Sequence, residues 1–204
     1  MLTALIATWI LTPIAPLNPI EQDTLPSISF HIAAGVTVPN GVVSTGSEIF
    51  GNYEMRVIHP FVIRLGVSLQ HKNMTSKIFP SGNINTIDLS VGGLYYRGSK
   101  MLVGYFGASA IYGINFFSPT SQTLDSLNIN EGVTDMSMGR KLGFGITLGL
   151  RIKKVYSFEI NITEMYPSLR KKMQSSSLVF STSGESVRTG TFRLTFGYVW
   201  AIIS

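Results

Sequence analysis

SISFHIAAGVTV, residues 27–38, alternates residue by residue between two kinds of side chain. One face carries the large apolar side chains Ile28, Phe30, Ile32, Val36 and Val38, whereas the other carries mostly small or polar ones. A period of two is that of a β-strand, because successive side chains point to opposite sides of the backbone. The segment therefore predicts a strand that separates an apolar environment from a polar one.

Seven further stretches repeat this alternation along the chain. They cover residues 49–57, 61–70, 87–96, 101–114, 141–151, 156–163 and 192–202. The fifth strand, 101–114, carries Gly or Ala on both faces, so the sequence does not show which side of it faces outward. We predict an all-β fold: an eight-stranded antiparallel up-and-down transmembrane β-barrel, which leaves no strand edge unpaired.

The connections between these strands alternate in length. Tight turns fall at residues 58–60, 97–100 and 153–154, and longer polar segments join the other strands, including 115–139 and 164–189. Alternate connections of an up-and-down barrel lie at opposite ends. The four long loops should therefore share one end, and the three turns and both termini the other, as in bacterial outer-membrane barrels.

The composition favours lipid around this barrel. Charged residues make up only 13% of the chain and hydrophobic residues 45%, and the mean hydropathy is +0.27. Past the N-terminus no apolar run is long enough for a membrane helix. A soluble lipocalin-like barrel is the alternative, with its polar face outward. Here that face consists largely of Gly, Ser, Thr, Ala and Asn, which suits a narrow barrel interior better than a solvated surface.

A few charged residues interrupt the small-residue face. They carry both signs, and we predict that they form an ion-pair network in the lumen: Glu54, Arg56, Arg64, Asp88, Lys141, Arg151, Glu159 and Arg193.

The N-terminal residues 1–20 precede the barrel domain, which we place at 26–203. Leu2 to Ile14 is mostly apolar and is too short to span a bilayer, so we interpret residues 1–20 as an export signal. No Lys or Arg precedes this apolar segment. The alternative interpretation is an ordinary buried segment.

Several functional classes are excluded or disfavoured by the sequence. The chain has no cysteine, so it has no disulfide and no thiol catalyst. Its net charge of +5 is modest and forms no basic, aromatic stripe for nucleic acid. His31, His59 and His71 do not have the spacing of metal ligands. We expect no metal, no cofactor and no catalytic residues. If the protein is an enzyme, His71 and the serines of the neighbouring loop are the residues that could form its site.

The C-terminal residues 195–202, TFGYVWAI, carry a local motif: a polar residue, Gly two positions on, then an aromatic and an apolar residue. Thr195, Gly197, Trp200 and Ile202 occupy these positions, and this order resembles the terminal signal of outer-membrane barrels. Ile202 stands where an aromatic residue is common, and two residues follow it. Across residues 26–202 the pattern resembles the small OmpA/OmpX-type barrels of Gram-negative bacteria.

This resemblance implies a location in the bacterial outer membrane, contact with its lipid and lipopolysaccharide, and assembly by the barrel-insertion machinery. Arg170, Lys171 and Lys172 form a basic cluster in the last long loop, which either contacts lipopolysaccharide phosphates or is simply solvated. We expect a non-enzymatic monomer with a structural, adhesion or surface-interaction role through its long loops. A lipid A-modifying enzyme is the alternative, and a narrow channel is a third.

Overall fold

Eight strands close into one antiparallel barrel in the computed structural model. The model describes residues 26–38, 43–74, 80–98, 101–175, 178–181, 184 and 186–203, so the expected export signal at 1–20 lies outside the described residues. The barrel strands are β1 (Ile28–Val38), β2 (Val43–Ile58), β3 (Phe61–Met74), β4 (Gly82–Gly98), β5 (Leu102–Pro119), β7 (Lys141–Ile152), β8 (Tyr156–Met165) and β11 (Phe192–Ile203).

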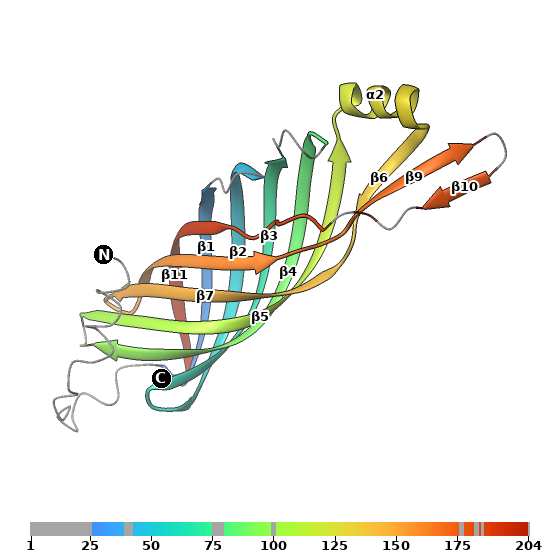
Figure 1. Ribbon diagram of the computed structural model, residues 1–204. Coiled ribbons are helices and arrows are strands. Elements are labelled where there is room, and N and C mark those ends of the chain that lie inside the picture. The colour runs from blue at the N-terminus through green and yellow to red at the C-terminus, as the bar shows by residue number, and fades with distance from the viewer. Residues whose placement is uncertain are drawn as a thin grey trace, which may run out of the picture.

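Each barrel strand pairs with its neighbour along the chain, and β11 closes the ring against β1 (Figure 1). The predicted eight-stranded, antiparallel up-and-down barrel is therefore confirmed. Ile28 pairs with Ile203, so both described ends of the chain lie at the end that carries the β2–β3 and β7–β8 turns. We call this end the turn end and the opposite end the extension end.

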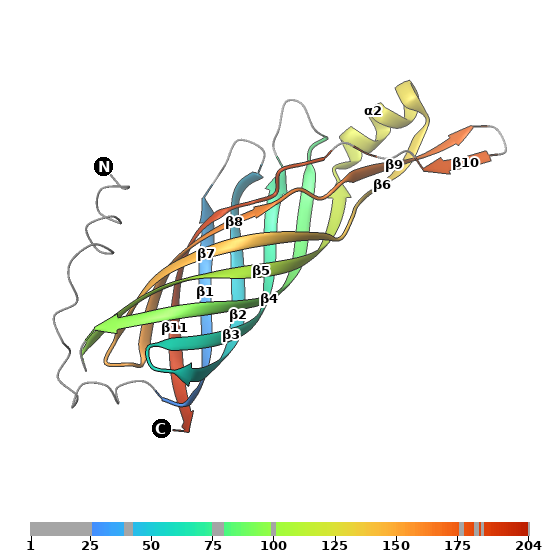
Figure 2. The same ribbon diagram turned by 60° about the horizontal axis from the view of Figure 1, so that its bottom comes forward.

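A smaller structure projects from the extension end (Figure 2). It consists of α2 (Ser121–Glu131) and a three-stranded sheet of β6 (Val133–Met138), β9 (Leu169–Ser175) and β10 (Leu178–Ser181). The helix starts at its N-cap Thr120 and ends at Gly132, whose φ of 67° is left-handed. No described helix has the length and apolar character needed to cross a membrane.

A compact apolar cluster lies where the extension joins the barrel mouth. Its buried members are Met74, Ile84, Phe117, Val133, Met136, Met138, Leu169 and Val187, with Leu124, Leu127 and Met173 packed against them. Phe117 at the end of β5 therefore belongs to this core. Its neighbour Phe116 does point outward and is 53% exposed.

The expected loops are shorter or more ordered than the sequence indicated. β2 starts at Val43 instead of residue 49, and β3 runs on to Met74, so the first two loops shrink. The segments 115–139 and 164–189 contain β6, β9, β10 and α2. Residues 44–48 of β2 carry polar or small side chains on both faces, so the apolar alternation that marks a strand in the sequence disappears there.

The structure also decides the facing of β5. Tyr105, Ile111 and Asn115 point inward and are buried, whereas Phe106 and Phe116 point outward. Tyr105 pairs with Gly149 across the β5–β7 ladder. A Cβ at Gly149 would lie 2.2 Å from the Tyr105 ring, so a glycine is needed there for the tyrosine to lie flat inside the wall.

Candidate functional site

The outer wall of the barrel is apolar on every strand. Its exposed large side chains include Ile32 and Val36 on β1, Leu65 and Val67 on β3, Phe144 and Ile146 on β7, and Phe196 on β11. On β3 this apolar face runs from Phe61 to Leu69, about 26 Å of strand at roughly 3.3 Å per residue. Exposed apolar surface of this extent is far beyond what a soluble monomer presents to water.

Aromatic side chains gather on this wall near the turn end. Trp200 stacks on Phe30 with ring centroids 6.2 Å apart, and it contacts Tyr198 at 4.6 Å. Tyr95 contacts Phe61 at 5.4 Å on the other side of the barrel. Such a girdle is typical of the level at which a barrel passes from lipid into water.

Inside the barrel, two guanidinium groups converge on the carboxylate of Glu54. Arg64 donates to Glu54 Oε1 from Nε at 2.9 Å and from Nη2 at 2.7 Å. Arg151 Nη2 donates to both carboxylate oxygens at 2.6 Å. The hydroxyl groups of Tyr96 and Ser29 donate to Oε2 at 3.1 and 3.2 Å. Because Glu54 is only 2% exposed, these charges neutralise one another away from water.

Glu159 completes this layer from the opposite wall. Arg64 Nη2 donates to Glu159 Oε1 at 2.7 Å, and the Tyr105 hydroxyl donates to the same oxygen at 2.5 Å. The rings of Tyr96 and Tyr105 stack 4.8 Å apart, with the Arg151 guanidinium 5.0 Å and 5.3 Å from their centroids. We call Glu54, Arg64, Arg151 and Glu159 the Glu54 cluster; it holds two positive and two negative charges.

His31 lies beside this cluster in an arrangement that looks catalytic. Its Nε2 is 2.5 Å from Ser157 Oγ, and its Nδ1 is 3.6 Å from Glu159 Oε1. A serine, histidine and carboxylate in that order form the nucleophile, base and orienting group of many hydrolases. His31 and Ser157 are 0% and 1% exposed, however, so no substrate reaches the hydroxyl. The three side chains instead fasten β1 to β8 across the lumen.

A second polar layer lies nearer the extension end. Arg193 forms an ion pair with Glu48, and Gln70 Nε2 donates to Asp88 and, at 3.4 Å, to Glu48. Lys72 reaches the carbonyl oxygen of Thr189 at 3.4 Å. All five side chains are buried. We call Glu48, Gln70, Lys72, Asp88 and Arg193 the Glu48 cluster; it too holds two charges of each sign.

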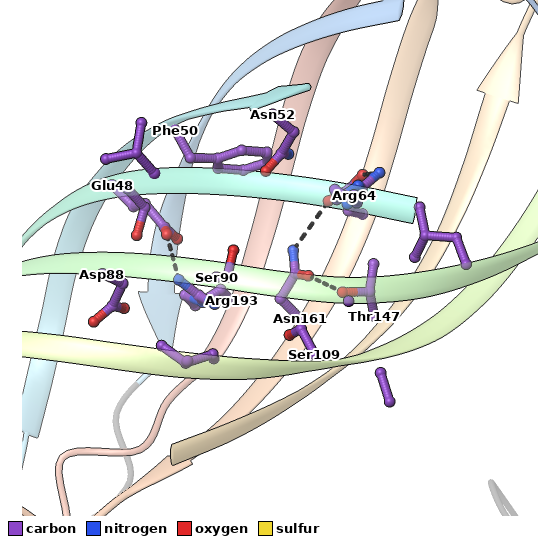
Figure 3. A pocket seen from close by; sticks show the side chains of 17 residues that line it. Glu48, Phe50, Asn52, Arg64, Asp88, Ser90, Ser109, Thr147, Asn161 and Arg193 are labelled. Carbon is purple, nitrogen blue, oxygen red and sulfur yellow. Dashed lines mark hydrogen bonds and ion pairs between the residues drawn. The ribbon is translucent and has the colours of Figure 1, made fainter. Parts of the chain in front are cut away.

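A small cavity of about 60 Å³ separates the two clusters (Figure 3). Arg64 and Glu159 line it from one side, and Glu48, Asp88 and Arg193 from the other. This volume accommodates a few water molecules but no larger solute. Paired charges therefore fill most of the lumen between the described strands.

Comparison with known proteins finds the same architecture. No protein-family model and no curated protein matches the chain. Among solved structures, the outer membrane protein OprG from Pseudomonas aeruginosa superposes with a TM-score of 0.56 at 13% identity, over 86% of this chain and 97% of that one. The protein has the fold of a small eight-stranded outer-membrane β-barrel.

Two further barrels resemble it less closely. Neisserial surface protein A gives a TM-score of 0.48 at 11% identity, over 86% of this chain and 96% of that chain. Ail, the attachment invasion locus protein of Yersinia pestis, gives 0.42 at 13%, over 85% and 97%. The fold assignment therefore depends on the likeness to OprG and on the closed sheet of this protein.

The charges predicted for the lumen divide into three groups. The structure brings most of them inside the barrel, namely Glu54, Arg64, Asp88, Arg151, Glu159 and Arg193. Arg56 is only half-buried and donates to Ser27 Oγ at 3.2 Å near the turn end. Lys141 is exposed, because it opens β7 at the end where the wall meets solvent; its assignment to the interior is wrong.

Sequence reasoning missed Glu48, Gln70 and Lys72 as members of the interior network. Glu48 and Lys72 lie just outside the strands that we predicted, and Gln70 was assigned to the polar face without a role. Counting in steps of two from Glu54 back to Glu48, and from Arg64 on to Lys72, would have placed both charges inside.

The C-terminal motif lies on β11, between β1 and β8. Thr195 and Gly197 face the lumen, whereas Trp200 and Ile202 are 44% and 58% exposed on the outer wall. A Cβ at Gly197 would lie 2.5 Å from His31 Nε2 and from the Ala33 Cβ. The motif glycine therefore leaves room for the buried histidine. Its role as an assembly signal stays a prediction.

The basic cluster does not form a single patch. Leu169 and Met173 turn one face of β9 toward the apolar cluster, and Lys171 lies on that same face, where it pairs with Glu131 at 2.6 Å. Arg170 and Lys172 lie on the opposite face and are exposed. A contact with lipopolysaccharide phosphates would therefore involve Arg170 and Lys172 without Lys171.

Proposed function

We propose that this protein is an integral outer-membrane barrel with a closed lumen, which acts at the cell surface through the extension of α2, β6, β9 and β10. The main support for this proposal is the Glu54 and Glu48 clusters. Each is a layer of buried side chains with balanced charges, and the two layers obstruct the lumen through which a solute would pass. With the lumen obstructed, the projecting extension is the part best placed to meet a partner. The proposal includes no enzymatic step.

The membrane location is supported by the outer wall. Apolar side chains cover it on every strand, aromatic residues gather near the turn end, and a closed barrel satisfies every backbone group between its strands in lipid. In barrels of this type the short turns face the periplasm, so the extension projects from the cell. The likeness to OprG supports the barrel fold and gives no information on a ligand.

Conductance recording tests the closed lumen. The protein is first shown to be folded by its change in gel mobility on boiling, and is then reconstituted into planar bilayers. We expect no steady conductance from the wild type. A stable ohmic conductance that scales with the amount of inserted, folded protein would contradict the proposal and favour the channel alternative.

Lipid analysis tests the non-enzymatic part. Lipid A isolated from cells with and without the protein should have the same mass spectrum. Loss or gain of an acyl chain or phosphate that depends on the protein would instead identify a lipid A-modifying enzyme.

We further propose that Arg170 and Lys172 contact lipopolysaccharide phosphates at the surface. Arg170→Gln with Lys172→Gln should weaken binding of the folded protein to lipopolysaccharide, most visibly at low salt. Lys153→Gln with Lys154→Gln, which removes the same charge at the turn end, should have no effect. Equal binding by both double variants would rule out this contact.

A further inference from the structure

A row of polar side chains crosses the outer wall just where its apolar face ends. Ser47 on β2 pairs with His71 on β3, and His71 pairs with Asn85 on β4. All three side chains point outward and are exposed. One step closer to the turn end, the outward positions on the same three strands are apolar: Ile49, Leu69 and Ile87.

These residues line a groove of about 450 Å³ on the outer wall. Ile49, Leu69 and Ile87 form its apolar part together with Phe116, which is Asn85's partner on β5. Ser47, His71 and Asn85 form its polar part. The groove is thus divided along the barrel axis into an apolar half and a hydrogen-bonding half, as an amphipathic ligand requires.

The height of the polar row matches the edge of the membrane. His71 is ten residues beyond Phe61 at the start of β3. That is roughly 33 Å of strand and, at a tilt of about 40°, roughly 25 Å along the barrel axis. The apolar band of outer-membrane barrels is about 25 Å tall. The polar row therefore lies where acyl chains join the head groups of the outer leaflet.

The polar half is preorganised by a hydrogen bond within it. His71 Nδ1 and Asn85 Oδ1 are 2.8 Å apart, so the imidazole N–H donates to the amide oxygen. This leaves His71 Nε2 to accept a hydrogen bond, and the Asn85 amide N–H and the Ser47 hydroxyl to donate. One step further from the turn end, the outward pair Asn73 and Asn83 adds two more amides.

Among the described residues that line the groove there is no Lys or Arg, and the lining residues Glu48, Gln70 and Thr86 have side chains buried on the lumen side of the wall. Phosphate groups are usually bound by cations, whereas hydroxyl and carbonyl groups are bound by neutral donors and acceptors such as these. The chemistry of the groove therefore favours a sugar with linked acyl chains over a phosphate head group.

We infer that this groove binds an acylated saccharide lipid of the outer leaflet. An acyl chain lies over Ile49, Leu69, Ile87 and Phe116, and the sugar hydroxyl and acyl carbonyl groups bond to Ser47, His71 and Asn85. The site is separate from Arg170 and Lys172, which would contact phosphates on the extension. The inference rests on the membrane location proposed above.

Photocrosslinking in living cells tests it. The photoreactive residue p-benzoylphenylalanine is introduced at Phe116, inside the groove, or at Phe144, which is similarly exposed (56% against 53%) on β7. Lipids captured on irradiation are identified by mass spectrometry. We expect the Phe116 site to capture acylated saccharide, and His71→Ala with Asn85→Ala to reduce this yield at least threefold while leaving capture at Phe144 unchanged.

The possible outcomes separate the two proposals. Failure to capture any lipid at either site, with the barrel folded, would contradict the membrane location. Lipid at both sites with no response to the double variant would overturn the groove alone, as would preferential capture of phospholipid at Phe116. His71→Ala and Asn85→Ala lie on the outer wall, and unchanged heat-dependent gel mobility shows that the variant barrel still folds.

Discussion

Replacing Glu54 with glutamine should cost more stability than any other single-charge change in the barrel. The wild-type carboxylate accepts four hydrogen bonds from Arg64 and Arg151. The glutamine amide keeps one oxygen as an acceptor but turns an N–H₂ group toward a guanidinium, so donor faces donor. The Glu54 cluster then holds two positive charges and one negative charge in the barrel interior.

Breaking a buried ion pair by removing one partner typically costs about 3–5 kcal/mol, and we expect a loss in that range for Glu54→Gln. The matched control is Glu131→Gln. Glu131 also forms an ion pair at 2.6 Å, with Lys171, but the two side chains are 41% and 31% exposed. Solvent screens that pair, so its loss should cost less than about 1 kcal/mol.

The assay is urea unfolding of the refolded barrel in detergent micelles, followed by tryptophan fluorescence and by the fraction of protein with folded gel mobility. The double variant Glu54→Gln/Arg151→Met removes one charge of each sign, so its loss should be smaller than the sum of the two single losses. If Glu54→Gln destabilises the barrel no more than Glu131→Gln does, the cluster is not the buried, charge-balanced layer described here.

Three further predictions concern the outer wall, the last strand and the topology. Leu148→Arg, facing lipid, should destabilise the folded barrel by about 2–4 kcal/mol and lower the folded fraction on gels. Thr147→Arg, facing the lumen, should lower that fraction less, and the reverse order would mean that the faces of β7 are wrongly assigned. Trp200→Ala should reduce folded yield in cells more than Phe192→Ala, although both should refold alike in detergent; equal yields in cells would remove the support for a C-terminal assembly signal. An epitope tag in α2 should be labelled on intact cells and one in the β7–β8 turn should not, and the opposite labelling would invert the topology.

The strands that touch both lipid and lumen could be recognised in the sequence. On β3, for example, Phe61 to Leu69 alternates large apolar residues with Arg64, Gly66 and Ser68, because lipid and a narrow polar interior make opposite demands on successive residues. That contrast was enough to predict the number of barrel strands, their antiparallel order and the segregation of the turns.

The same reasoning fails where the contrast disappears. Residues 44–48 of β2 carry polar or small side chains on both faces, because this part of the strand lies beyond the apolar wall. The strand start was therefore placed six residues late. On β5 the inward face includes Tyr105 and Ile111, which pack inside the wall. An apolar lumen face gives no alternation, and only the closed barrel shows which side is inward.

The alternation along the chain is enough to predict a closed barrel and the residue types that face its interior, since the period of two is a local property of each strand. It did not determine how those residues meet. Arg64 binds Glu54 and also Glu159, which is 95 residues away along the chain, and Ser47, His71 and Asn85 form one row on three strands. Both arrangements depend on the register between strands and on the curvature that brings opposite walls together. Register and closure are set by the whole sheet at once, so the pairing of the charges and the place for a ligand can be read only from the folded barrel.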